Sequence, residues 1–163
     1  MRGAPDRPFR PVPTGAVYGT IIVMAVVASV SEDAAADPFE MLGAVVLSAF
    51  AFWLAHVYAD VLSRRLSSPS GAFGEQLGAS LRDAWPLLQT AGAPALALLL
   101  AGFGGLSRSA GVALALGLGL VQLFAWGTAL ARRHGRSGLR ALASGLVNLG
   151  IGLLVVLLKA LVH

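Results

Sequence analysis

Five long apolar stretches fill most of this chain, and their lengths limit what it can fold into. They cover residues 14–30, 39–62, 84–104, 110–131 and 139–162. An α-helix rises about 1.5 Å per residue, so about 20 apolar residues cross the roughly 30 Å of hydrocarbon in a bilayer. Since lipid offers no hydrogen bonds, the backbone of each stretch must satisfy itself as a helix. The sequence therefore predicts an all-α, polytopic transmembrane helical bundle with five transmembrane helices.

The composition agrees with a membrane domain. Hydrophobic residues make up 56% of the chain, charged residues make up 12%, and the mean hydropathy is +0.77. Soluble domains carry about 25% charged residues, so this chain has too few to cover a water-soluble surface. We expect one transmembrane domain over residues 14–163, preceded by a Pro/Arg-rich tail over residues 1–13.

The charges indicate an orientation. Of the 12 Lys and Arg residues, all but Arg108 and Lys159 fall on one side if the five stretches alternate in direction. Cytoplasmic loops carry the excess of Lys and Arg, so we expect a cytoplasmic N-terminus and a multi-pass protein of the cell membrane. The first stretch also resembles a signal peptide that ends at residues 34–36, but this small-residue site lies late and acidic residues flank it.

Several classes of function are disfavoured. The chain has no Cys, which excludes disulfides and thiolate metal sites. We expect no metal and no cofactor, because His56 and Asp60 supply only two ligands within one chain. No phosphate-binding loop or hydrolase motif is present, so we expect no enzyme activity. The arginines lie beside apolar stretches and form no stripe with aromatic residues, so we expect no nucleic-acid binding.

The most informative polar residues lie in the second stretch. His56 and Asp60 are four residues apart and share one helix face, with Trp53 one turn earlier. His56 lies about 7 Å from the middle of the stretch, still in hydrocarbon, where ionisable residues are costly and often functional. We expect its imidazole to face the bundle interior and to bond with Asp60. An ion pair between Asp60 and Arg64 is the structural alternative.

Other polar side chains occur at the same depth in the remaining stretches. They predict a polar cluster in the half of the bundle nearer the cytoplasm. The alternative is that they only form hydrogen bonds between helices, worth about 0.6 kcal/mol each. The candidate proton or ligand site comprises His56, Asp60, Trp53, Tyr18, Gln89, Gln122 and Asn148.

Three local patterns predict further structure. Residues 75–83 are expected to form a short interfacial helix with Leu77 and Leu81 facing the membrane. Gly92 and Pro94 are expected to kink the third helix. Small residues at four-residue spacing let helices approach closely, within the bundle or between subunits. Such pairs are Ala113 with Gly117 and Ala115 with Gly119.

Four segments of the chain carry a resemblance to known proteins. They are residues 14–19 (TGAVYG), 31–33 (SED), 52–60 (FWLAHVYAD) and 157–163 (LLKALVH). With these segments, the outline is similar to that of small, uncharacterised integral membrane proteins of high-GC Gram-positive bacteria. This resemblance implies a membrane location and a helical fold, and it implies no activity.

Two functions fit these patterns. The first is a small channel or transporter for protons or a small solute, in which His56 titrates beside Asp60. The second is a non-catalytic membrane subunit or scaffold that binds a partner protein. The channel or transporter is the favoured function, with the polar cluster in the cytoplasmic half of the bundle as its site. The nearly apolar outer half disfavours a continuous aqueous pore and keeps the second function open as the alternative. In both cases the expected partners are the lipid bilayer and either further copies of the chain or another membrane protein.

Overall fold

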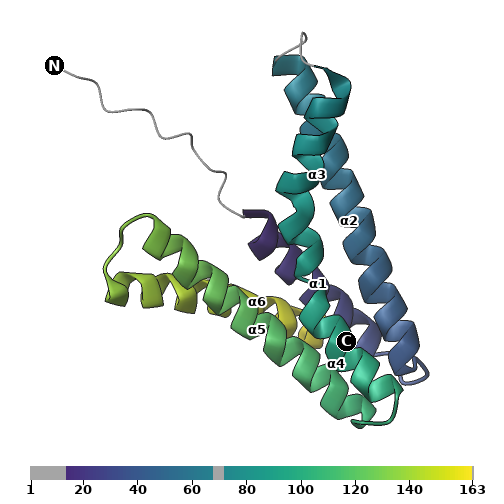
Figure 1. The fold of residues 1–163 in the computed structure, drawn as a ribbon. Helices are drawn as coiled ribbons and strands as arrows, with labels where there is room; N and C mark the ends of the chain where they lie inside the picture. The colour runs from purple at the N-terminus through teal and green to yellow at the C-terminus, as the bar shows by residue number, and fades with distance from the viewer. Residues whose placement is uncertain (1–13, 68–71, 163) are drawn as a thin grey trace, which may run out of the picture.

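A computed structural model describes residues 14–67 and 72–162, and this part of the chain is helical with short connections (Figure 1). The predicted tail over residues 1–13 lies outside the described residues. The all-α class is confirmed. The helices are α1 (Thr14–Ser31), α2 (Pro38–Ser67), α3 (Phe73–Gln89), α4 (Gly92–Gly102), α5 (Arg108–Arg133) and α6 (Gly138–Val162).

Helix α1 lies at the centre of the molecule, where it contacts α2, α3, α5 and α6. Its buried residues include Thr20, Val23, Met24 and Val27. Gly19 allows a close approach to α3, because a Cβ atom there would lie 2.7 Å from the Thr90 hydroxyl oxygen and 3.1 Å from the Leu87 carbonyl oxygen. A short apolar helix therefore forms the common core for the longer ones.

The longer helices form two hairpins that diverge from this core. Figure 1 shows α2 and α3 side by side in one direction and α5 and α6 side by side in another. The two hairpins together form a V that is closed at one end. Helix α4 packs against α2 and α5 near this closed end. The arginines near the two hairpin tips consequently lie apart: Arg64, Arg65 and Arg82 belong to α2 and α3, and Arg132, Arg133, Arg136 and Arg140 belong to the end of α5, the following turn and the start of α6.

The third predicted helix has different bounds from those expected. Helix α3 begins at Phe73 and includes the segment predicted as a separate interfacial helix, and a 46° bend separates it from α4. The bend falls at Thr90 and Ala91, just before the predicted kink. The Thr90 hydroxyl donates to the Leu87 carbonyl at 2.6 Å. Pro94 has no N–H to donate to the Thr90 carbonyl, so the regular ladder stops here.

The structure contains the apolar helices of a membrane protein. Helices α2, α5 and α6 are long and apolar enough to cross a bilayer, and the bent pair α3–α4 counts as a fourth span if it crosses as one unit. Helix α1 is apolar but shorter. Helix α2 has 30 residues, or about 45 Å at 1.5 Å per residue, so it extends beyond about 30 Å of hydrocarbon.

At the closed end of the V, Arg108 joins two connections. Its guanidinium group donates to the carbonyl oxygens of Ser31 at 3.0 Å, Asp33 at 2.6 Å and Ala36 at 2.9 Å. The rings of Phe39 and Phe103 pack edge to face nearby, with centroids 5.5 Å apart. The acidic α1–α2 connection and the α4–α5 connection therefore lie at the same end of the molecule.

Only one of the two predicted small-residue pairs of α5 is used within the chain. Ala115 and Gly119 are buried, and a Cβ atom on Gly119 would lie 2.5 Å from the Met24 side chain of α1. Ala113 is exposed, and Gly117 has nothing within 4 Å of the Cβ position. The first pair thus packs α5 on α1, and the second faces away from the bundle.

Candidate functional site

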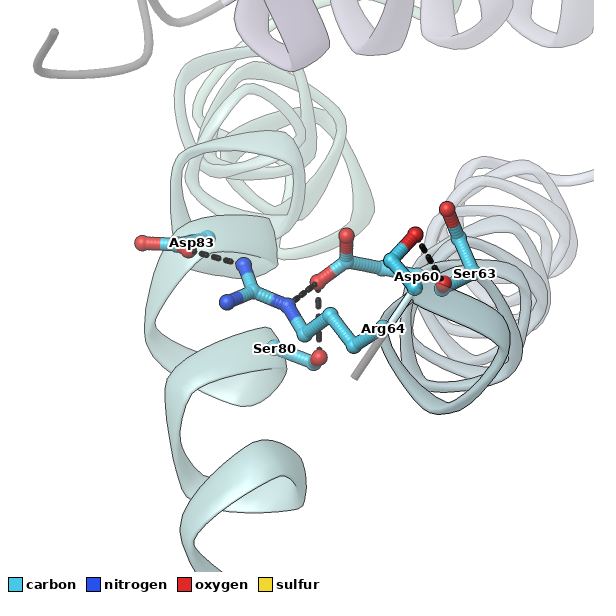
Figure 2. Close-up of polar contacts among 6 residues, drawn as sticks. Asp60, Ser63, Arg64, Ser80 and Asp83 are labelled. Atoms are coloured by element: carbon cyan, nitrogen blue, oxygen red, sulfur yellow. Dashed lines mark hydrogen bonds and ion pairs between the residues drawn. The ribbon is translucent and has the colours of Figure 1, made fainter. Parts of the chain in front are cut away.

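The centre of the candidate site is a charged cluster between α2 and α3 (Figure 2). One Asp60 carboxylate oxygen accepts a hydrogen bond from Arg64 Nε at 2.7 Å and another from the Ser80 hydroxyl at 2.6 Å. Arg64 also donates through Nη2 to Asp83 at 2.7 Å. The arginine therefore lies between two carboxylates, one from each helix.

A small apolar cluster positions these groups. Val57, Val61 and Ala84 are buried between α2 and α3, and Trp53, Leu77 and Leu81 pack around them. The expectation that Leu77 and Leu81 face the membrane is therefore wrong. Residues 73–83 have too many polar side chains to lie buried on all sides. Their apolar side, which includes Leu77 and Leu81, packs against Val57 and Val61 near the end of α2.

His56 does not face the bundle interior, contrary to the sequence-based expectation. Its side chain is exposed, whereas Val57 beside it is buried. The buried positions Val45, Ala49, Val57 and Val61 follow a four-residue spacing, which moves the packed face about 40° around the helix at each step. At the level of His56 this face has turned toward α3, and the imidazole lies outside it.

The structure does not bring the other candidate residues into one cluster. Tyr18 and Gln89 are exposed on α1 and α3. Gln122 is half-buried on α5, and Asn148 on α6 donates to the Ser144 carbonyl of its own helix at 3.0 Å. The predicted polar groups are thus divided among α1 and the two hairpins.

Three of the polar side chains in the packed regions have a buried atom without a conventional hydrogen-bond partner. These atoms are Trp53 Nε1, Gln122 Oε1 and Thr128 Oγ1. For Thr128 the packing supplies a reason, because the Cβ position of Gly145 on α6 points directly at this hydroxyl oxygen.

The reasoning from sequence missed two members of the charged cluster, Ser80 and Asp83. Both lie in the segment that separated the second and third apolar stretches. A usable signal was present, since residues 80 and 83 are one helical turn apart and therefore share a face. The pairing of this face with Asp60 and Arg64 required the antiparallel register of α2 and α3.

The chemistry of the cluster is that of a structural ion-pair network. With Arg64 protonated and both carboxylates ionised, the three charges sum to −1. Asp60 accepts its hydrogen bonds from Arg64 and Ser80, and these replace the bond that was predicted from the His56 imidazole. Within the described part of the chain, no group of three or more His, Asp and Glu side chains could hold a metal ion.

Comparisons of the chain with protein-family models, with curated proteins and with solved structures give no match.

Proposed function

We propose that this chain is a non-catalytic membrane subunit, and that it associates with a second copy of itself through the outward face of α2. One observation carries this proposal: His56 is exposed in the apolar part of a helix long enough to span a membrane. An amide or hydroxyl without a hydrogen-bond partner in an apolar medium costs about 1–3 kcal/mol, and an imidazole facing lipid meets the same problem. A neighbouring helix in the membrane removes this cost.

The residues around His56 suit a close helix–helix contact. Ala51, Ala55 and Ala59 are exposed and four residues apart, so they form a smooth ridge beside the imidazole. Tyr58 is 70% exposed on the same helix and supplies a second polar group. A second copy is the favoured occupant, because neutral imidazole both donates and accepts and can pair with itself across a two-fold axis.

Disulfide cross-linking tests the association, since the chain has no Cys of its own. The variant Ala55→Cys is expected to give a covalent dimer in membranes under mild oxidation. Ala143→Cys on α6 is the matched control, because it is also an exposed alanine. Ala113→Cys tests the open small-residue pair of α5 as a rival interface. Cross-linking equal to that of the control, or confined to Ala113→Cys, would refute the α2 interface.

A transport function is the second candidate, and the titratable His56 beside the charged cluster supports it. In a dimer through α2, two imidazoles would lie together within the membrane and could pass protons between them. Proton flux into proteoliposomes, measured from about pH 5.5 to about pH 8, tests this function. Flux lost in both His56→Ala and Asp60→Asn would support it, and flux no higher than in empty liposomes would argue against it.

We further infer five crossings of the cell membrane with the N-terminus in the cytoplasm. The position of α1 among four other helices supports a crossing by this shorter helix as well. The grouping of arginines at the two hairpin tips supports the orientation. In intact cells, a cysteine introduced at exposed Ser137 should resist impermeant thiol reagents, whereas one at exposed Ser109 should react. The reverse result would invert the topology.

A further inference from the structure

The turn between α5 and α6 is the most basic part of the described chain. Arg132, Arg133, Arg136 and Arg140 lie within nine residues, all with exposed side chains. The last acidic residue of the whole sequence is Asp83, so no carboxylate side chain occurs in α5, in α6 or between them. No carboxylate of the described residues forms an ion pair with any of the four.

The other hairpin tip is different, although it is also basic. There Arg64 lies between Asp60 and Asp83, and the Arg65 guanidinium stacks on the Phe73 ring at 4.6 Å from its centroid. Two of its three arginines, Arg64 and Arg65, are thus engaged within the chain, whereas Arg82 is exposed. An orientation signal requires only that positive charge be present, so it does not account for this difference in pairing.

The four arginines are also not needed to cap α5. The backbone of the turn does this, since Gly135, at φ +70°, donates to the Arg132 carbonyl and Arg136 N–H donates to the Ala131 carbonyl. These two bonds form a Schellman motif. The His134 ring lies 2.9 Å from the Leu130 carbonyl oxygen and completes the helix end. The guanidinium groups therefore remain available for an external anion.

The apolar surroundings indicate where that anion comes from. Leu139, next to Arg140, is 81% exposed, and Leu142 one turn further is also exposed. Helices α5 and α6 are both apolar enough to span a membrane, so the turn that joins them falls at the level of the headgroups. A cation beside an exposed leucine matches a lipid, which offers a phosphate and an acyl chain together.

We propose that the α5–α6 turn binds the phosphate of anionic lipid headgroups. Arginine suits this ligand because its planar fork donates two parallel hydrogen bonds to phosphate oxygens.

The test compares two double variants with the same change in charge. Arg133→Gln with Arg136→Gln alters the α5–α6 turn, and Arg65→Gln with Arg82→Gln alters the other tip. Each full-length protein is placed in nanodiscs, and its binding of fluorescent phosphatidylglycerol is measured against phosphatidylcholine. Helicity and monodispersity in detergent are checked first. The turn variant should bind phosphatidylglycerol roughly thirtyfold more weakly, since each arginine near an anionic surface contributes a factor of about five.

Three results would overturn the proposal. Equal losses in the two variants would mean that total charge alone attracts the lipid. Unchanged binding in the turn variant would mean that these arginines do not contact it. Displacement of the fluorescent lipid by millimolar inorganic phosphate would assign the site to a soluble anion. Retained lipid preference in wild type together with a loss confined to the turn variant would support the proposal.

Discussion

At the scale of single residues, glycines determine how closely the two long helices of the second hairpin approach. A Cβ atom on Gly127 would meet the Asn148 side chain, and one on Gly145 would meet the Thr128 hydroxyl and the Phe124 ring. The contacts run in both directions across the same interface. Each helix thus supplies a glycine where the other supplies a side chain, so the interface tolerates little added volume.

This packing predicts a difference between two glycines of the same helix. Gly145→Ala should lower the free energy of unfolding by about 1–3 kcal/mol, because overpacking forces helices or side chains apart. Gly150→Ala is the control, since its Cβ position has nothing within 4 Å. It should be neutral or slightly stabilising. Unfolding in mixed micelles at increasing SDS fraction measures both, and equal effects would contradict the close approach of α5 and α6.

The sequence revealed some of these residues but not their partners. Small residues at four-residue spacing are visible in α5 and α6, yet Ala115 with Gly119 is packed and Ala113 with Gly117 is open. Both pairs have the same local pattern. Which one is buried depends on where Met24 of α1 lies, and this is a property of the tertiary fold. For the same reason the exposure of His56 could not be derived from its own helix.

At the scale of elements, the break between α3 and α4 divides a stretch that hydropathy alone shows as continuous. Hydropathy identifies the apolar part of this region but not the start of α3, because residues 73–83 are polar on one side. The helix continues through Pro86 but stops at Thr90. Thr90 is buried and bonds to Leu87, and α1 packs on this point through Gly19. Neither contact is local enough to be read from the sequence.

The bend predicts different effects for two prolines. Pro94→Ala restores an N–H that can donate to the Thr90 carbonyl, so the angle between α3 and α4 should decrease. Spin labels on cysteines at exposed Arg82 and Leu96 should then move farther apart, as measured by pulsed electron spin resonance. Pro86→Ala is the control and should leave the distance unchanged. No change with Pro94→Ala would assign the bend to the Gly19 contact.

At the scale of the whole molecule, the two hairpins are held together at one end. Helices α1 and α4 pack between them, and Arg108 ties the start of α5 to the α1–α2 connection. The sequence predicted that Arg108 and the acidic connection lie on the same side of the membrane, and in the structure the two lie at the same end of the molecule. It did not show that the arginine binds backbone carbonyls rather than the nearby carboxylates.

Loss of this contact should affect the entire V. Arg108→Ala removes three charge-assisted hydrogen bonds, each worth about 1.5–3 kcal/mol when buried. Because two of the three are only part-buried and the third is exposed, we expect the free energy of unfolding to fall by at least about 2 kcal/mol. Hydrogen exchange should quicken over residues 31–37. Arg136→Ala removes an arginine without an ion-pair partner and is the control. Equal effects of the two variants would show that the hydrogen bonds of Arg108 to the α1–α2 connection do not hold the hairpins together.

The central position of α1 has a consequence for biosynthesis. This helix leaves the ribosome before the others, yet Met24 packs against Gly119 of α5 and Gly152 of α6, which are made last. Domains generally acquire structure in the order of synthesis. Here the packing around Met24 is completed only when nearly the whole chain has been made. A chain that stops before α5 would therefore expose its own core to lipid and to membrane quality control.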